Sequence, residues 1–214
     1  MKIVSTPQRR QPDRNRPKGS VLVESALVIS LILVPMLLSV STVGLNLVRA
    51  VQVNQINRDA GHMFARGVDF STTATGLVNR GVIFKLAPAL TNTTTRGTAV
   101  AILSSVEYLN STTSCPDPCS NRYHVVVTQQ IILGNPALKA SAFRTVPTGS
   151  MSLDGSGKVN NARGDGAVQA DGVLSYLTMS DGDIAYISET YFSSADLAIP
   201  GFPSPLGTAA RAFF

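Results

Sequence analysis

The sequence has few of the residues that carry acid–base, nucleophilic or metal chemistry. Its 214 residues include two histidines and two cysteines, and the histidines, His62 and His124, lie far apart along the chain. A serine or cysteine nucleophile needs a base beside it, and a structural zinc site usually has four protein ligands. We therefore expect neither an enzyme nor a resident metal or other cofactor.

Charge is also scarce, and the imbalance lies at the N-terminus. Residues 1–19 hold six basic side chains and one acidic one, whereas the remaining 12 basic and 12 acidic side chains balance each other. The body of the chain has no cluster of lysines and arginines, which argues against a nucleic-acid partner. A basic segment beside an apolar run instead holds that end of the chain in the cytoplasm and sends the remainder across the membrane.

A long apolar run, residues 20–48, follows this basic leader. About 20 residues at ~1.5 Å each cover the ~30 Å hydrocarbon core, so the run predicts a transmembrane helix. It is about twice as long as the apolar part of a secretory signal. Pro35 removes one backbone hydrogen bond and should kink the helix locally. Apolar residues then continue at a spacing of three to four, which predicts that the helix runs on to Gly67.

Residues 49–214 predict an α+β head outside the membrane. A second helix is expected from Thr73 to Leu86, capped by Ser71 or Thr72 and stopped by Pro88. Its packing stripe comprises Leu77, Val78, Val82, Ile83 and Leu86. Runs of β-branched and aromatic residues predict strands at 99–109, 123–133 and 183–192, and a shorter fourth strand fits residues 173–179. Three or four antiparallel strands packed on the helices make the fold class α+β.

The remaining segments read as loops and turns. Residues 147–172, rich in glycine, asparagine and aspartate, predict a long exposed or partly disordered loop. Residues 199–214 read as a proline-rich turn region with an apolar tail. Asp181 and Asp183, with Asp171 upstream, have the oxygen ligands that Ca²⁺ prefers, but a turn ahead of a strand explains them more simply.

The two cysteines, Cys115 and Cys119, lie four residues apart in the sequence SCPDPC. Outside the cytoplasm they can form a disulfide, which would pin a local turn because the closed loop is short. Two free thiols, or a redox or metal-binding pair, are the alternatives.

The junction between the leader and the apolar run carries the one charge of that run, Glu24, at the fifth position after Gly19. A carboxylate in hydrocarbon is costly, so Glu24 indicates a function. A membrane-embedded aspartyl peptidase needs an extended, unhindered bond at the cytoplasmic face, and Gly19–Ser20 suits this. After cleavage Ser20 would carry a new ammonium about one helical turn from Glu24, which could pair with that ammonium or with a neighbour's. A boundary carboxylate that reaches the headgroups is the plainer alternative.

The basic leader, Gly19, Glu24 and the apolar helix together resemble the processing site of type IV prepilins. More narrowly, residues 16–67 resemble the N-terminal region of the TadE-like pseudopilins of the tight-adherence (Flp) pilus. The likeness includes Ala26-Leu27-Val28, Pro35 and Ala65-Arg66-Gly67, whereas Ser25 follows Glu24 where the family usually has an aromatic residue.

This resemblance implies a minor pseudopilin that is needed to assemble an adhesive pilus. Prepilin peptidase would cleave it at Gly19–Ser20, and Glu24 would act in assembly. One helix would hold it in the bacterial inner membrane or in a cell-surface pilus, with the leader in the cytoplasm and the head outside. Its implied partners are the peptidase, other pilin or pseudopilin subunits and inner-membrane platform proteins.

Other classes stay open at this level. The chain could instead be a major pilin that forms the filament itself. It could also be a signal-anchored extracytoplasmic binding domain, which predicts an uncleaved leader and a dispensable Glu24. A secreted hydrolase would need a polar catalytic cluster, and the sequence shows none.

Overall fold

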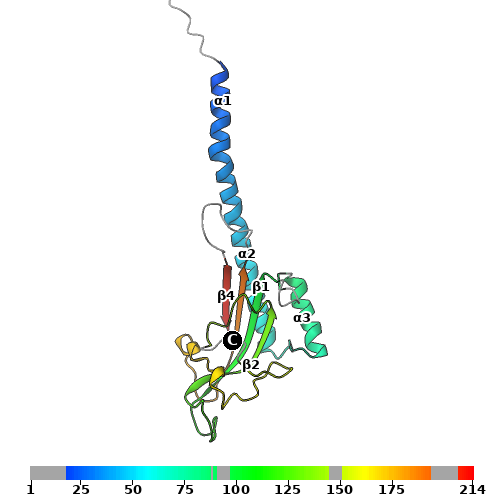
Figure 1. The fold of residues 1–214 in the computed structure, drawn as a ribbon, viewed down its shortest axis with the longest axis vertical. Coiled ribbons are helices and arrows are strands. Elements are labelled where there is room, and N and C mark those ends of the chain that lie inside the picture. Colours follow the sequence, from blue (N-terminus) through cyan, green and yellow to red (C-terminus); the bar gives the residue numbers. More distant parts are fainter. Residues whose placement is uncertain (1–17, 88, 91–96, 145–150, 194–206) are drawn as a thin grey trace, which may run out of the picture. The chain divides into compact units, whose positions relative to one another are not determined.

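The computed structural model describes residues 18–87, 89–90, 97–144, 151–193 and 207–214, with side chains from residue 21 onward. The chain has an α+β fold with a long N-terminal helix, a further helix α3 and a four-stranded antiparallel sheet (Figure 1). It divides into two units, residues 1–43 and residues 44–214. Each unit is described below by itself.

Three consecutive helical elements make up the N-terminal helix: α1 Lys18–Val28, the π-helical turn η1 Ile29–Leu33 and α2 Val34–Ala65. Residues Val21–Ala65 are long and apolar enough to cross a membrane. Proline lacks the N–H that an α-helix needs and its ring crowds the carbonyl four residues earlier. A π-helical turn directly before Pro35 relieves this conflict, and within it the N–H of Val34 donates to the carbonyl of Ile29.

The helix ends where the sequence predicts. Gly67 has a φ of +80°, a left-handed conformation that favours glycine. The N–H groups of Gly67 and Val68 donate to the carbonyls of Phe64 and Met63, each at 2.9 Å. These bonds satisfy carbonyls that the end of α2 would otherwise leave free.

The second helix, α3, spans Ala74–Leu86, and its cap differs from the predicted one. Thr73, and not Ser71 or Thr72, is the N-cap, and its hydroxyl accepts from the N–H of Gly76 at 3.2 Å. The Thr73 hydroxyl in turn donates to Asp69 at 2.6 Å, and this bond, together with those from Ser71, lowers the pKa of that carboxyl. Pro88, the predicted stop, lies outside the described residues.

The predicted packing stripe of α3 is wrong in most of its members. Ile83 is buried, together with Gly76. The other four apolar residues of the stripe are exposed: Leu77, Val78, Val82 and Leu86. The helix therefore attaches to the head through a narrow face, and most of its apolar surface points away from the core.

The sheet has the order β2-β1-β3-β4, with all pairs antiparallel. Its first three strands confirm the sequence prediction: β1 is Ala99–Leu109, β2 is His124–Gly134 and β3 is Ile184–Ser193. The fourth strand was predicted in the wrong place. Residues 173–179 form no strand, and the 3₁₀-helix η4 spans Asp171–Ser175. The fourth strand is instead β4 Gly207–Phe213, in the segment that reads as a turn region and apolar tail.

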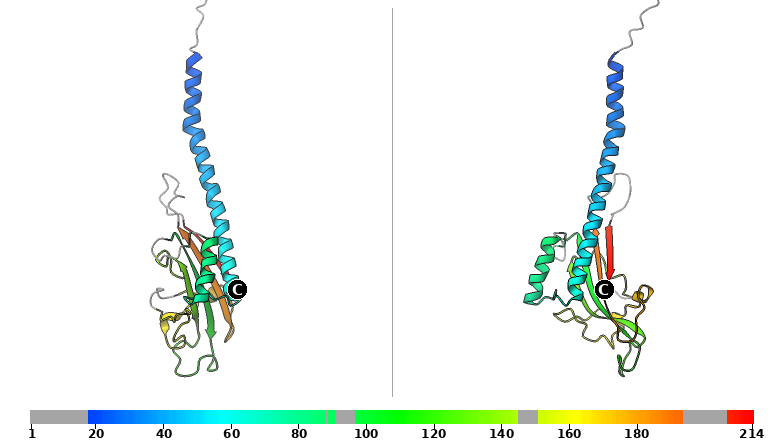
Figure 2. Two further views of the ribbon diagram at one scale, coloured as in Figure 1. Left: turned by 90° about the vertical axis from the view of Figure 1, so that its right-hand side faces the viewer. Right: turned by 180° about the vertical axis from the view of Figure 1, so that it is seen from behind.

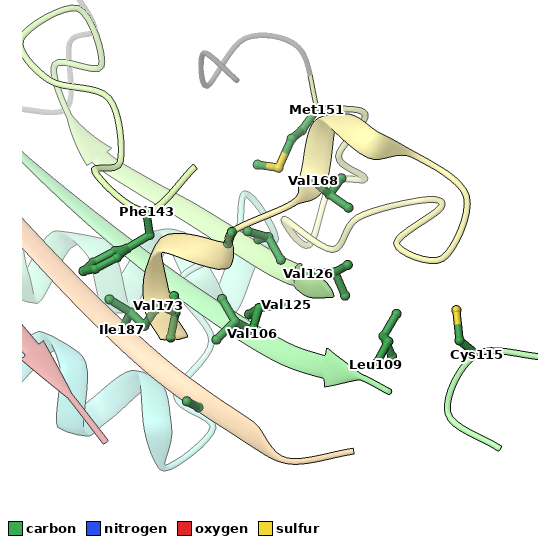
Figure 3. Packing of buried hydrophobic residues seen from close by; sticks show 13 residues of the cluster. Val106, Leu109, Cys115, Val125, Val126, Phe143, Met151, Val168, Val173 and Ile187 are labelled. Carbon is green, nitrogen blue, oxygen red and sulfur yellow. The ribbon is translucent and has the colours of Figure 1, made fainter. Parts of the chain in front are cut away.

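One face of the sheet packs on the outer half of α2 (residues 44–65) and on α3. This core includes Ala60, Phe64, Phe70, Ile83, Ala101, Leu103 and Leu133. A second buried cluster lies on the other face of the sheet and at the end where β1 leads into the β1–β2 connection (Figure 3). It includes Val106, Val125, Phe143, Val168, Val173 and Ile187. The sheet is thus covered by helices on one side and by connecting segments on the other.

The glycine-rich segment is a loop with many exposed residues, as its composition predicts, but it is also fastened to the sheet. Within its described part, 151–172, Met151 and Val168 are buried against the second cluster. Main-chain hydrogen bonds tie it to β2, from the N–H of Gln130 to the carbonyl of Gly157 at 2.8 Å and from the N–H of Ala170 to the carbonyl of Val125 at 2.8 Å. The segment thereby covers an edge of the sheet that would otherwise present unpaired groups.

Candidate functional site

The predicted processing bond lies inside the first turn of α1. The helix begins at Lys18, so Gly19 and Ser20 both have helical backbone, which differs from the extended bond that a peptidase requires. The first four N–H groups of a helix have no partner within it, and helix ends fray. Opening of the first described turn of α1 would expose the Gly19–Ser20 bond.

Four hydroxyl groups within the apolar helix are satisfied by the helix itself. In each case the hydroxyl donates to the carbonyl four residues earlier: Ser25 to Val21 at 2.7 Å, Ser30 to Ala26 at 2.9 Å, Ser39 to Pro35 at 2.8 Å and Thr42 to Leu38 at 2.7 Å. These polar groups can therefore enter hydrocarbon without an outside partner.

Glu24 cannot use the same solution. An ionised carboxylate only accepts hydrogen bonds, so it cannot donate to a backbone carbonyl as these hydroxyls do. The side chain is exposed, and among the described side chains, from residue 21 on, no hydrogen bond or ion pair to it occurs. Helical side chains lean toward the N-terminus, so Glu24 is directed toward the level of Ser20. A cation for Glu24 must come from the start of its own helix or from another molecule.

The disulfide joins Cys115 and Cys119, whose Cα atoms are 5.7 Å apart. Cys115 is fully buried in the second cluster, and the guanidinium of Arg122 donates to its carbonyl at 3.0 Å. Arg122 also pairs with Asp117 at 2.7 Å. The bridge lies in the connection between β1 and β2, and its surroundings fit a structural role.

Asp181, in the turn that leads into β3, holds the same connection in place. Its carboxylate accepts from the N–H groups of Asn110 and Ser111, at 2.6 and 3.0 Å, and from the hydroxyl of Ser114 at 2.5 Å. The pKa of Asp181 is lowered to about 2, mainly by the side-chain hydrogen bonds from Ser111 and Ser114.

The aspartates considered for Ca²⁺ do not converge. Asp181 binds the β1–β2 connection, Asp183 accepts from the N–H of Ser180 at 2.6 Å, and Asp171 pairs with His124 at 2.7 Å. Across the described part of the chain, no group of three or more histidine, cysteine, aspartate or glutamate side chains is placed to hold a metal ion.

The two histidines lie in different surroundings. The ring of His62, on α2, lies 4.4 Å from that of Phe214, and His124 pairs with Asp171 at the start of β2. No described contact joins either histidine to the disulfide or to a hydroxyl nucleophile.

Two buried polar groups escaped the sequence-based reasoning. Asn57, on the outer half of α2, is 1% exposed and accepts from the hydroxyls of Ser188 and Thr190 at 2.8 and 2.9 Å. Glu189 is also buried, and it accepts from the hydroxyl of Ser141 and from the N–H of Ala142. Arg211 lies 3.6 Å from the same carboxylate. In the sequence Asn57 and Glu189 look like ordinary surface residues between apolar ones. Their burial becomes visible only through hydrogen bonds to segments that are distant along the chain.

Comparison with known proteins gives no match. No family model, no curated protein and no solved structure matches the chain.

Proposed function

We propose that the chain is a pilin-class structural subunit, a TadE-like minor pseudopilin that serves in the assembly of an adhesive pilus. In this proposal prepilin peptidase removes residues 1–19, and the matured subunit stays in the bacterial inner membrane or enters the pilus. The head then lies outside the cytoplasm, in a compartment that permits the Cys115–Cys119 disulfide.

The observation that carries the proposal is the apolar environment of Glu24 and the absence of a partner for it among the described side chains. It is the one charged residue of the apolar run 20–48, and among the described side chains, from residue 21 on, none forms a hydrogen bond or ion pair with it. Cleavage at Gly19–Ser20 would create an ammonium one helical turn away. A neighbouring subunit's ammonium would serve equally well and would set the register between packed helices.

The α+β head supports the same proposal in a general way. A helix that leaves the membrane and packs its outer half on an antiparallel sheet is the arrangement expected of a pilin. The described head shows a disulfide and turn-fastening carboxylates, and these stabilise it without implying a reaction.

The test is the N-terminal mass of the protein from membranes of cells with and without a prepilin peptidase. The proposal expects a peptidase-dependent start at Ser20. An intact leader in both strains would contradict it and would favour a signal-anchored binding domain.

Gly19→Leu should block removal of the leader, because a bulky side chain obstructs the scissile bond. Gly44→Leu is the matched control, since Gly44 lies on the same long helix with open space around its Cα and should leave processing unchanged. Normal processing of Gly19→Leu would count against the prepilin interpretation.

A further inference from the structure

The two edges of the sheet differ in how they are covered. Segment 151–172 bonds to the outer edge of β2, for instance from the N–H of Val159 to the carbonyl of Thr128 at 2.9 Å. β4, red in Figure 1 and in the right-hand view of Figure 2, is the last strand on the opposite side. Beyond the pairing with β3, no main-chain hydrogen bond joins β4 to another described segment. Among the described residues, this edge of the sheet is therefore open.

The register of β3 and β4 shows which groups point outward. Tyr186 and Phe214 exchange both main-chain hydrogen bonds, at 3.0 and 2.9 Å, so they form a hydrogen-bonded pair. Bonded and non-bonded pairs alternate along an antiparallel ladder, and this ladder continues along β4 without a shift in register. Ala209, Arg211 and Phe213 therefore direct their N–H and C=O groups away from β3. We call these outward groups the β4 edge.

The devices that usually block an open edge are missing from β4. An open edge is a template for another strand, and natural proteins guard it with proline, a bulge or outward charges. The sequence of β4, GTAARAF, has no proline, and the strand pairs without a bulge. Its one charged side chain, Arg211, lies over the sheet, with its guanidinium carbon 5.3 Å from the centre of the Phe143 ring and its Nε 3.6 Å from Glu189. Ala209 is small and exposed, so the main chain beside it is accessible.

Positive charge lies beside the β4 edge, on the face of the sheet that carries Arg211. Arg211 and Lys139 line a small hollow together with Tyr191 and Ala209. Lys139 is exposed, and its ammonium lies 5.8 Å from the centre of the Tyr191 ring. The acid that also lines the hollow, Glu189, is buried and already accepts hydrogen bonds from the protein. A carboxylate on an incoming strand would therefore meet two cations.

An aromatic surface follows on the same face, two residues farther along β4. The ring of Phe213 stacks on that of Tyr176, with 5.8 Å between the ring centres, and Tyr176 is 60% exposed. Residues two apart on a strand share a face of the sheet. A strand with an acidic residue opposite Arg211 would thus place an apolar side chain against these rings if that side chain lies opposite Phe213.

Charge argues against a second copy of β4 as the incoming strand. When two β4 strands overlap along most of their length in antiparallel orientation, their Arg211 side chains lie directly opposite or diagonal to each other on one face. Like charges in such positions repel, and β4 has no acidic residue that would offset them.

We propose that the β4 edge binds an extended acidic segment of a partner protein, which adds to the sheet as a further strand antiparallel to β4. A carboxylate of this segment lies opposite Arg211 and an apolar side chain lies opposite Phe213. Main-chain hydrogen bonds provide the affinity, and these two side chains provide the specificity. The inference depends neither on cleavage after Gly19 nor on the pilin assignment.

Fluorescence anisotropy of a labelled peptide mixed with the full chain in detergent tests the proposal. The probe is the capped peptide TVTETVT, in which the glutamate would face Arg211 and the first valine would face Phe213. Its Kd should be about tenfold lower than that of the matched peptide TVTKTVT, or ~1.4 kcal/mol in binding free energy. A methyl group on the main-chain nitrogen of the glutamate keeps the charge but removes the donor to the Arg211 carbonyl. This change should weaken binding by about tenfold as well.

Variants of the protein locate the binding site. Ala209→Pro removes an outward N–H and leaves the bonds to β3 in place, so it should abolish binding. Ala209→Val keeps that N–H and is the matched control, which should still bind. Amide exchange by NMR on the unmodified chain keeps the test independent of any effect of proline on folding. The peptide should slow exchange at Arg211 and Phe213 and leave Ala210 unchanged, because the N–H of Ala210 already bonds to β3.

Three outcomes would overturn the proposal. The first is the absence of saturable binding of TVTETVT, and the second is equal binding of this peptide and its N-methylated form. The third is a full chain that is dimeric without peptide and becomes monomeric on Ala209→Pro, since a second copy would then occupy the β4 edge.

Discussion

Replacement of Asn57 by leucine should destabilise the head through the two hydroxyls that the amide serves. Ser188 and Thr190 are 0% and 3% exposed, and both donate to the Asn57 carbonyl oxygen. A buried donor left without a partner costs ~1–3 kcal/mol. Two hydroxyls lose their acceptor, so the cost applies twice, but a hydroxyl can rotate toward another acceptor. We therefore expect the lower part of the summed range, a loss of about 2–4 kcal/mol in the free energy of unfolding. That is a large share of the ~5–15 kcal/mol that stabilises an ordinary domain.

The assay is urea unfolding of the detergent-solubilised full chain, followed by circular dichroism because the sequence contains no tryptophan. Asn54→Leu is the matched control: Asn54 is exposed one turn earlier on α2, and its change should stay within about 0.5 kcal/mol. Removing the donors as well, in Asn57→Leu with Ser188→Ala and Thr190→Val, should recover about 2 kcal/mol relative to the single variant. The reasoning fails if Asn57→Leu is as stable as the wild type, or if the triple variant is no more stable than Asn57→Leu.

Three more outcomes are expected. Glu24→Leu should remain inserted in the membrane but lose pilus assembly, since the new ammonium would have no carboxylate; wild-type pilus yield, measured by shearing and quantifying surface pili, would make Glu24 a bystander. Gly61→Val should lower the free energy of unfolding by about 1–3 kcal/mol in the same urea assay, because an added Cβ clashes with the ring of Phe214 and lies 2.9 Å from the Cβ of Ser188; an unchanged midpoint would show that this contact yields easily. Asp181 has a folded-state pKa of about 2 against an ordinary value of 3.8, so its stabilising effect is complete above pH 3.8 and is lost as the pH falls toward 2. The difference in Tm between the wild type and Asp181→Asn should accordingly shrink over that interval, and a constant difference would contradict the assignment.

Local chemistry explains which parts of the fold the sequence could predict. Strands β1, β2 and β3 are dense in β-branched and aromatic residues, and Gly67 ends α2 through a backbone conformation that glycine adopts at little cost. The apolar helix follows from composition and length alone. Gly19 and Glu24 were likewise visible as a spacing within one short segment.

Other features depend on segments that meet only in the folded chain. β4, with the sequence GTAARAF, has little strand preference of its own and becomes a strand by pairing with β3. Segment 151–172 is polar in composition, yet it is ordered by hydrogen bonds to the edge of β2 and by a few buried side chains.

Elements whose signal lies within a few neighbouring residues can be predicted from the sequence alone: the membrane-length helix, its charged residue Glu24, its end at Gly67 and three strands. Burial depends on the folded chain. The amide of Asn57 lies inside the head and Val78, Val82 and Leu86 of α3 lie outside it, although an amide is expected at the surface and apolar residues at this spacing are expected in the core. The physical reason is that burial depends on which distant segments approach a residue, and spacing along one helix specifies a face without specifying what covers it.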